Sequence, residues 1–136
     1  MNKKRVHTPE GVRDVYGTEY GQRSKLKAKL NKVFASYGYE GIRTPGFEFF
    51  DVFNSEKGTV SAREMFKFFD REGNTLVLRP DVTPSIARCI AKYFNEENMG
   101  IRLSYAGNVF LNTSSYQLKL KETCQIGAEL VNDASV

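Results

Sequence analysis

Apolar residues recur at helical spacing from about Thr18 to Tyr37 and predict the first helix of the chain. Arg and Lys fill most of the other positions, which predicts a solvated face; an RNA-binding stripe is the alternative interpretation. Gly38 follows at once and suits the left-handed residue that ends many helices, with Tyr39 folding back. We expect the apolar stripe to face the core through Leu26, Leu30, Val33, Phe34 and Tyr37.

Extended segments follow this helix. The stretch from Tyr39 to Thr44 ends at Pro45, and a residue before proline favours extended geometry. Residues 65–69 and 75–78 flank a polar five-residue turn and predict a β-hairpin. An apolar cluster is expected just before this hairpin at Phe47, Phe49, Phe50 and Phe53.

A second helix is predicted to begin at Pro84, because proline fits the first helical position. Thr83 is then the expected N-cap, since a threonine hydroxyl can accept from the free N–H groups of the first turn. The apolar positions of this helix predict a buried stripe made of Ile86, Ala87, Ile90, Ala91 and Phe94.

Two more strands are predicted near the end of the chain. The first alternates apolar and polar residues from Ile101 to Tyr105, the second runs from about Leu118 to Val131, and residues 108–117 between them predict a polar loop. Helices combined with a mostly antiparallel sheet make an α+β fold. Nothing follows the last strand to cover the sheet, so we expect residues 1–136 to be part of a larger domain with an incomplete core.

Composition and charge disfavour several classes of protein but do not indicate a particular reaction. The net charge of +4 is mild and unclustered, which disfavours a nucleic-acid-binding protein. No apolar run is long enough to span a membrane, and the basic N-terminus leads into no apolar segment. Cys89 and Cys124 are expected to be reduced core thiols of a cytoplasmic protein. His7 is the only histidine, so a His-dependent triad and a multi-His metal site are not expected, and we expect no cofactor.

The last predicted strand carries a polar face with a gap in it. Gln125, Gly127 and Glu129 share this face, because side chains alternate along a strand. A gap between an amide and a carboxylate suits a small polar ligand, since backbone can approach closely at glycine. The plainer interpretation is a solvent-facing strand with an incidental glycine. The opposite, apolar face is expected to hold Leu118, Leu120, Cys124, Ile126, Ala128 and Leu130.

The segment from Leu78 to Pro84 joins a strand end to a helix start. Free backbone N–H groups gather at such a junction and favour anions or carboxylates. Asp81 and Thr83 can simply cap the helix. Helix capping and ligand binding are compatible if Thr83 caps the helix and Asp81 points into a pocket.

Taken in order, these segments resemble the core of class II aminoacyl-tRNA synthetases, specifically the histidyl-tRNA synthetase branch. The long helix, residues 39–44 and Pro45 look like motif 1, which implies a homodimer interface around Pro45. Residues 78–83, Leu-Arg-Pro-Asp-Val-Thr, resemble the loop that contacts the amino-acid substrate in that family. Residues 105–129, beginning Tyr-Ala-Gly-Asn-Val-Phe, resemble motif 2, a strand–loop–strand unit.

The departures from the family pattern concern the phosphate-binding groups. Motif 2 places an arginine after its phenylalanine and an acidic residue two positions later, whereas this chain has Leu111 and Thr113 there. Leucine has no charge and no donor, and losing one such contact costs about 10²–10³ in rate. The acidic residue of the substrate loop is shortened to Asp81, and motif 3 with its second arginine is absent. The resemblance therefore implies a chain that cannot perform synthetase chemistry by itself.

Residues 7–14 and 78–84 look closer to a paralogous family, the regulatory subunits of ATP phosphoribosyltransferase. That family acts in histidine biosynthesis, keeps the synthetase-like fold and dimerisation, and has lost aminoacylation. It partners a short catalytic subunit and transmits feedback inhibition by histidine. The resemblance implies that the remnant of a histidine pocket consists of Asp81, Thr83, Gln125, Gly127 and Glu129. The main alternative is a fragment of a divergent histidyl-tRNA synthetase that activates histidine with ATP.

Overall fold

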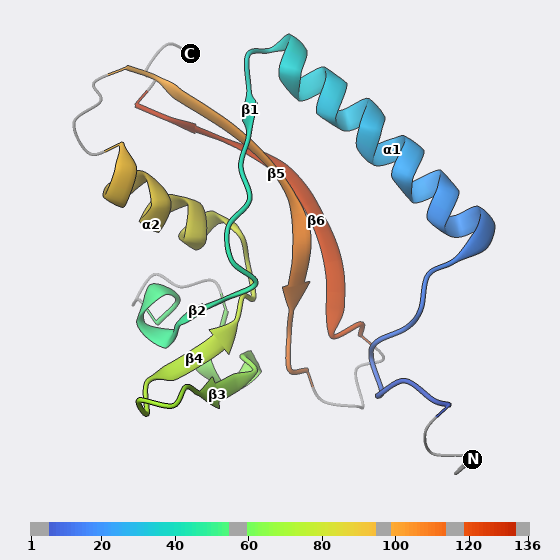
Figure 1. Ribbon diagram of the computed structural model, residues 1–136, viewed down its shortest axis with the longest axis vertical. Helices are drawn as coiled ribbons and strands as arrows, with labels where there is room; N and C mark the ends of the chain where they lie inside the picture. Colours follow the sequence, from blue (N-terminus) through green and yellow to red (C-terminus); the bar gives the residue numbers. More distant parts are fainter. Residues whose placement is uncertain (1–5, 55–59, 95–98, 114–118, 133–136) are drawn as a thin grey trace.

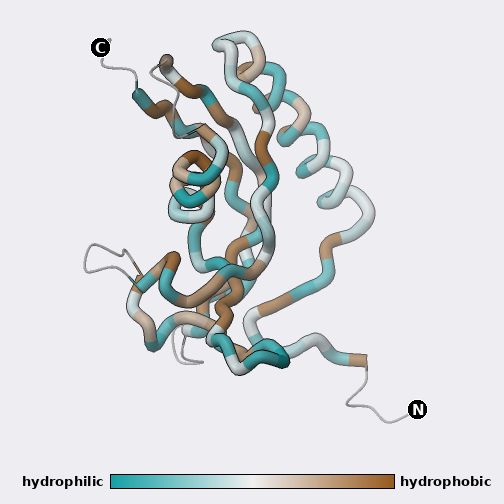
Figure 2. Tube along the Cα trace, turned by 60° about the vertical axis from the view of Figure 1, so that its left-hand side comes forward, coloured by the Kyte–Doolittle hydropathy of each residue, from teal (hydrophilic) through white to brown (hydrophobic). Residues whose placement is uncertain are grey.

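The computed structural model describes residues 6–54, 60–94, 99–113 and 119–132 and places them in two small sheets and two α-helices (Figure 1). Helices α1 and α2 lie on opposite sides of a long two-stranded hairpin, β5–β6 (Figures 1 and 2). The second sheet lies beside one end of α2. The α+β class expected from the sequence is confirmed.

Helix α1 (Gly17–Ser36) ends where the sequence predicts. Gly38 has φ +78°, and its N–H donates to the Ala35 carbonyl over 3.0 Å. The Tyr39 N–H donates to the Phe34 carbonyl, also over 3.0 Å, and the two rings lie 6.2 Å apart between centroids. These bonds satisfy carbonyls of the last turn and fold the chain back along the helix, as expected for a glycine-terminated helix.

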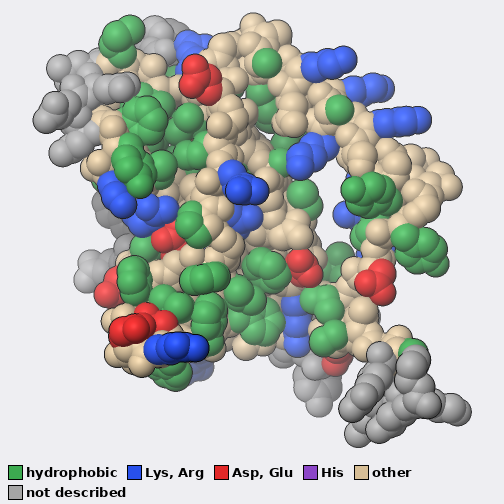
Figure 3. All heavy atoms as spheres, in the orientation of Figure 1, with side chains coloured by type: hydrophobic (Ala, Val, Ile, Leu, Met, Phe, Trp, Pro, Cys, Tyr) green, Lys and Arg blue, Asp and Glu red, His purple; other side chains and the backbone are tan. Residues whose placement is uncertain are grey.

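The apolar stripe of α1 does not face a core, contrary to the sequence-based expectation. The helix has no buried residue, and Leu26, Val33 and Tyr37 are 57%, 52% and 68% exposed. Its link to the sheet is near its C-terminal end, where Arg102 Nη1 donates to the Tyr37 carbonyl over 3.1 Å. Lys and Arg side chains project from its outer side (Figure 3), and no helix among the described residues is long and apolar enough to cross a membrane.

The first sheet has the strand order β1–β5–β6, built from β1 (Glu40–Gly41), β5 (Ile101–Phe110) and β6 (Glu122–Val131). Strand β1 runs parallel to β5, and β5 pairs antiparallel with β6 along its whole length. The prediction that a polar loop begins at Asn108 is wrong, because β5 continues through Phe110. The side-chain amide of Asn108 donates to Glu122 on the neighbouring strand over 2.9 Å. Strand β6 begins at Glu122, later than expected, and Leu118 lies outside the described residues.

The second sheet is antiparallel, with order β2–β4–β3. It contains β2 (Phe47–Phe49), β3 (Lys67–Phe69) and β4 (Thr75–Leu78), with the short 3-10 helices η2 (Phe50–Val52) and η3 (Ala62–Glu64) nearby. The predicted hairpin is confirmed as β3–β4. Its turn is held by Asp70, whose carboxylate accepts from the backbone and side-chain N–H groups of Asn74 over 2.8 Å.

Helix α2 (Thr83–Tyr93) covers the first sheet with one narrow face. Ile86 is 1% exposed and packs with the buried residues Val82, Ile101, Leu103 and Val109. Ile90 and Phe94 pack at the edge of this cluster, whereas Ala87 and Ala91 are exposed, so three of the five predicted stripe residues contribute to the core. A second cluster contains Phe53, Met65 and Val77.

Several residues expected inside lie at the surface. Phe47 and Phe49 are 53% and 55% exposed, so the predicted aromatic cluster is reduced to Phe53 with Phe50 beside it. Cys124 is exposed and Cys89 half-buried, so neither is a fully buried core thiol, although both are free. The described part of the chain therefore has a small core and much uncovered apolar surface.

We predict that Ile86→Ala lowers the free energy of unfolding by about 2–5 kcal/mol, because it leaves a cavity in the cluster that joins α2 to the sheet. The matched control is Leu26→Ala, which removes a similar side chain from an exposed face of α1. We expect this control to change stability by less than about 0.5 kcal/mol. Urea unfolding followed by circular dichroism measures both, and equal losses would contradict the described core.

Candidate functional site

The polar residues Gln125 and Glu129 of β6 lie on the same face of the sheet as the core cluster, and both are half-buried. In the β5–β6 ladder Leu103 pairs with Glu129, Tyr105 with Gly127, and Gly107 with Gln125. Directly paired residues share a face, so this polar row lies on the face that carries Leu103 and is covered by α2. The apolar side chains of β6 lie on the opposite face. Its residues are Cys124, Ile126, Ala128 and Leu130, of which Cys124 and Leu130 are exposed.

Helix α2 meets this polar face at its first residue. Thr83 Oγ1 donates to Glu129 Oε1 over 2.6 Å, joining residues 46 apart in the sequence. The predicted N-cap role is wrong, because Thr83 is inside the helix and the capping position, Val82, has no side-chain cap. Asp81 Oδ1 accepts from the Val82 N–H over 2.7 Å, so this carboxylate lies at the start of the helix.

The gap expected at Gly127 is filled by Tyr105. A β-carbon on Gly127 would lie 2.6 Å from Tyr105 Oη, so glycine is needed for the ring to rest on the strand. Burial raises the pKa of Tyr105 above its ordinary value of 10.0; a hydrogen bond with Thr83 opposes this, and the Glu129 and Asp81 carboxylates reinforce it. The phenol therefore stays protonated at neutral pH.

Tyr105 is a site residue that sequence reasoning missed. It was expected only as one apolar position of an alternating strand. The signal that could have found it is the ladder register, since Tyr105 pairs directly with Gly127. Its hydroxyl lies beside Thr83 and within the electrostatic reach of Asp81 and Glu129. Together these four side chains offer two carboxylates and two hydroxyls, which suits a cationic or hydrogen-bond-donating group.

A second glycine on the same face, Gly107, lies under the guanidinium of Arg79. A β-carbon there would collide with the Arg79 side chain. Arg79 is only 8% exposed. Its Nε donates to the Asn108 carbonyl over 2.7 Å, and Nη1 donates to the carbonyls of Thr44 and Pro45 over 2.9 and 3.3 Å. This residue therefore links β5 to the segment that follows β1.

The other residues that the sequence analysis singled out lie outside the group formed by Thr83, Tyr105, Asp81 and Glu129. The Oε1 atom of Gln125 is buried and has no hydrogen-bond partner among the described residues, and the same holds for Thr113 Oγ1. Leu111 lies past the end of β5 and is half-buried, with its N–H donating to the Lys121 carbonyl over 2.8 Å. Pro45 is exposed. The described residues contain no group of three side chains suited to a metal ion.

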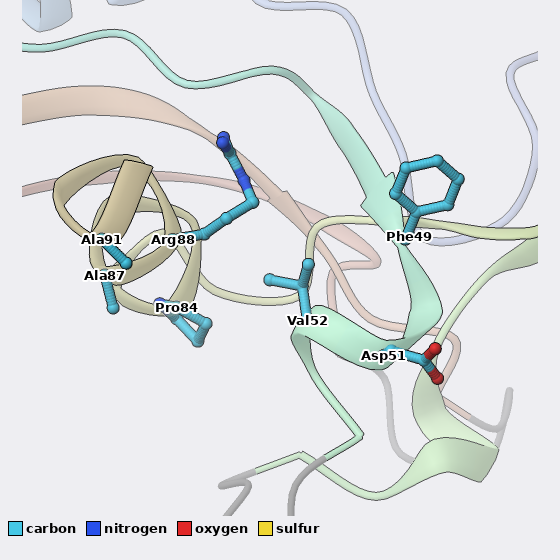
Figure 4. Close-up of a pocket in the computed structure, with 7 residues that line it drawn as sticks. All are labelled: Phe49, Asp51, Val52, Pro84, Ala87, Arg88 and Ala91. Carbon is cyan, nitrogen blue, oxygen red and sulfur yellow. The ribbon is translucent and has the colours of Figure 1, made fainter. Parts of the chain in front are cut away.

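A groove of about 620 Å³ opens on the other side of α2 (Figure 4). Its rim carries Arg88, whose Nε and Nη2 both donate to Glu48 Oε1, over 3.0 and 2.9 Å. The groove lies apart from the polar face, although Pro84 in its wall follows Thr83 directly. Its lining is mostly apolar and consists of Phe49, Asp51, Val52, Pro84, Ala87, Arg88 and Ala91.

Comparison with known proteins gives this geometry a family context. The family model for histidyl-tRNA synthetase matches residues 11–136. An ATP phosphoribosyltransferase regulatory subunit from Acetivibrio thermocellus is 40% identical over 131 residues, which is 96% of this chain and 31% of that protein. A protein of the same name from Ruminiclostridium cellulolyticum is 38% identical over 135 residues, or 99% of this chain and 32% of that protein. The chain thus spans about a third of the length of these relatives.

Solved structures agree in fold. A Bacillus halodurans protein described as an ATP phosphoribosyltransferase regulatory subunit/histidyl-tRNA synthetase superposes with a TM-score of 0.85 at 31% identity, covering 96% of this chain and 33% of its own. The apo histidyl-tRNA synthetase of S. aureus gives a TM-score of 0.71 at 28% identity, covering 90% of this chain and 28% of its own. The expected class II synthetase-like fold is therefore confirmed. With the family match over nearly all of its length, the chain belongs to the histidyl-tRNA synthetase family.

Proposed function

We propose that this chain is the N-terminal part of a non-catalytic regulatory subunit of ATP phosphoribosyltransferase, which supports a short catalytic subunit and makes it sensitive to histidine. The observation that carries the proposal is a combination of two features. The site around Thr83 and Glu129 brings carboxylates and hydroxyls together, and Leu111 stands where the resemblance to motif 2 would place a phosphate-binding arginine. The relatives at 38–40% identity bear the same functional name.

The proposed ligand of the site is histidine. The carboxylates of Asp81 and Glu129 suit its ammonium and imidazole groups, and Tyr105 stays protonated and can donate or accept. Glu129 already accepts from Thr83, so a cation bound there competes with or adds to the contact that ties α2 to β6. A ligand that favours one arrangement of this contact shifts the equilibrium between states, with couplings of about 1–3 kcal/mol in typical allosteric proteins.

The assembly that we propose is a homodimer that binds the catalytic subunit in a hetero-oligomer. The exposed apolar residues of α1 and the surface around Pro45 are the proposed homodimer contact, because large apolar side chains there have no cover among the described residues. The proposed compartment is the cytoplasm, where the free thiols of Cys89 and Cys124 stay reduced.

A divergent histidyl-tRNA synthetase is the second candidate. The match to the synthetase family model over residues 11–136 favours it, as does the superposition with the S. aureus enzyme. Leu111 and Thr113 weigh against it. An apolar side chain at position 111 offers nothing to the charge that develops on a transferring phosphoryl group.

We expect the full-length protein that contains this chain to bind a short-form ATP phosphoribosyltransferase and to change its turnover or its inhibition by histidine. Size-exclusion chromatography with light scattering reports the complex, and steady-state assays with and without histidine report the regulation. The control is the catalytic subunit alone. Absence of a complex, together with unchanged turnover and histidine sensitivity, would refute the proposed function.

We expect Glu129→Gln to weaken histidine binding by about tenfold or more, since a hydrogen bond to a charged group contributes about 1.5–3 kcal/mol. The matched control is Glu122→Gln, which alters a carboxylate on the same strand but on the opposite face. Isothermal titration calorimetry measures both affinities. Equal affinity of the two variants for histidine would place the ligand elsewhere.

We expect no histidine-dependent ATP–pyrophosphate exchange from the full-length protein that contains this chain, because Leu111 cannot neutralise the α-phosphate. The measurement is an exchange assay with an authentic histidyl-tRNA synthetase as the positive control. A robust exchange signal that requires histidine would instead support the synthetase alternative.

A further inference from the structure

Glu48 is a buried carboxylate that lies outside the candidate site. Its side chain is 7% exposed, and its backbone pairs with Val77 in the ladder between β2 and β4. Arg88 of α2 donates to Glu48 Oε1 from both Nε and Nη2, over 3.0 and 2.9 Å. A buried ion pair adds little net stability compared with an apolar contact of the same size, because both charges lose water. Its clearer effect here is to define one position of the helix against the strand.

The groove between α2 and β2 lies on the side of the helix that carries this ion pair (Figure 4). Ala87 and Ala91 line one wall, and Phe49 and Val52 line the other, around a volume of about 620 Å³. Both alanines are exposed and short, so apolar packing does not fill the space. The buried side of α2 is instead the side of Ile86, which packs on the first sheet. Toward the second sheet the helix therefore has room to shift.

The same helix is attached to the candidate site at its first residue. Thr83 Oγ1 donates to Glu129 Oε1 over 2.6 Å. Thr83 and Arg88 belong to one continuous helix and lie about 7.5 Å apart along its axis at the usual rise. Packed helices slide as units in many conformational transitions, because their internal hydrogen bonds stay intact. A displacement at Thr83 is therefore also a displacement at Arg88.

We propose that α2 transmits occupancy of the candidate site to β2, with the Arg88–Glu48 ion pair as the link. This inference rests on the proposed function, because it requires a ligand at Glu129. A cationic group that binds Glu129 competes with Thr83 and releases the first turn of α2. The helix then shifts in the groove, and the ion pair carries the displacement to β2.

The link connects the site to a surface with a proposed role in assembly. Strand β2 begins two residues after Pro45, in the region proposed for the homodimer contact. A ligand shifts an equilibrium only through contacts that differ between two states, and the Thr83–Glu129 hydrogen bond is such a contact. Couplings between two sites are typically about 5–150-fold in affinity.

The first test compares the full-length protein that contains this chain with and without L-histidine, by hydrogen–deuterium exchange. We expect histidine to change the deuterium uptake of residues 47–52, which form β2 and η2 across the groove from α2. The turn at residues 70–74 is the internal reference, because it lies at the end of β4 that is opposite to α2. We expect its uptake to stay unchanged. This comparison needs no substitution, so it does not depend on whether a variant folds.

A substitution then tests the ion pair. Glu48→Gln removes the charge at nearly constant size, and we expect the histidine-dependent change in residues 47–52 to be lost while calorimetry still detects histidine binding. Arg88→Lys keeps the charge and should keep the change. The matched control is Glu19→Gln, which removes a carboxylate from an exposed ion pair on α1 and should also keep it.

The outcomes separate the link from the site. Unchanged uptake in residues 47–52 when histidine binds, or an undiminished response in Glu48→Gln, overturns the link and leaves the histidine site intact. Failure of histidine to bind the unmodified full-length protein overturns the proposed ligand, and this inference with it.

Discussion

The arrangement of the molecule depends on one buried side chain, Arg79, which joins three segments distant in sequence. Its side chain donates to the Thr44 and Asn108 carbonyls, and its backbone N–H donates to Gly46 over 3.0 Å. Its own carbonyl accepts from the Phe110 N–H over 3.0 Å. The strand end of β4, the link after β1 and the end of β5 are therefore held at one point. Because α2 begins four residues later, the same point sets where Thr83 meets β6.

The candidate site follows from two glycines on one face of the β5–β6 hairpin. Gly127 makes room for the ring of Tyr105, and Gly107 makes room for Arg79. Neither glycine leaves an empty gap, so the site is lined by the large side chains that the glycines admit. The polar residues of β6 are tolerated under α2 because Glu129 has a partner in Thr83. A polar face placed against a core costs free energy unless its groups are hydrogen-bonded, and the Oε1 atom of Gln125 has no such partner among the described residues.

Local sequence patterns predicted the helices and strands. Long-range contacts determine which of their faces are buried and which residues meet. The glycine at position 38 and the β3–β4 hairpin depend on neighbours in sequence, and both were predicted correctly. Alternation along β6 correctly grouped Gln125 with Glu129, but periodicity cannot say which of two faces a helix will cover. The apolar positions of α1 predicted an amphipathic helix, but periodicity does not specify which surface covers them, and the described residues bury none of them. Arg79 has no local pattern at all, since its partners are 29–35 residues away.

The contacts of Arg79 also have a consequence for how the fold opens. They join residues 29 to 35 positions apart in the sequence, about as far apart as Ile101 and Val131 at the end of the β5–β6 ladder. The segments that contain Thr44, Arg79 and Asn108 can separate only when these buried bonds break together. Local opening at this point is therefore expected to cost more free energy than fraying of helix α1, which buries no residue.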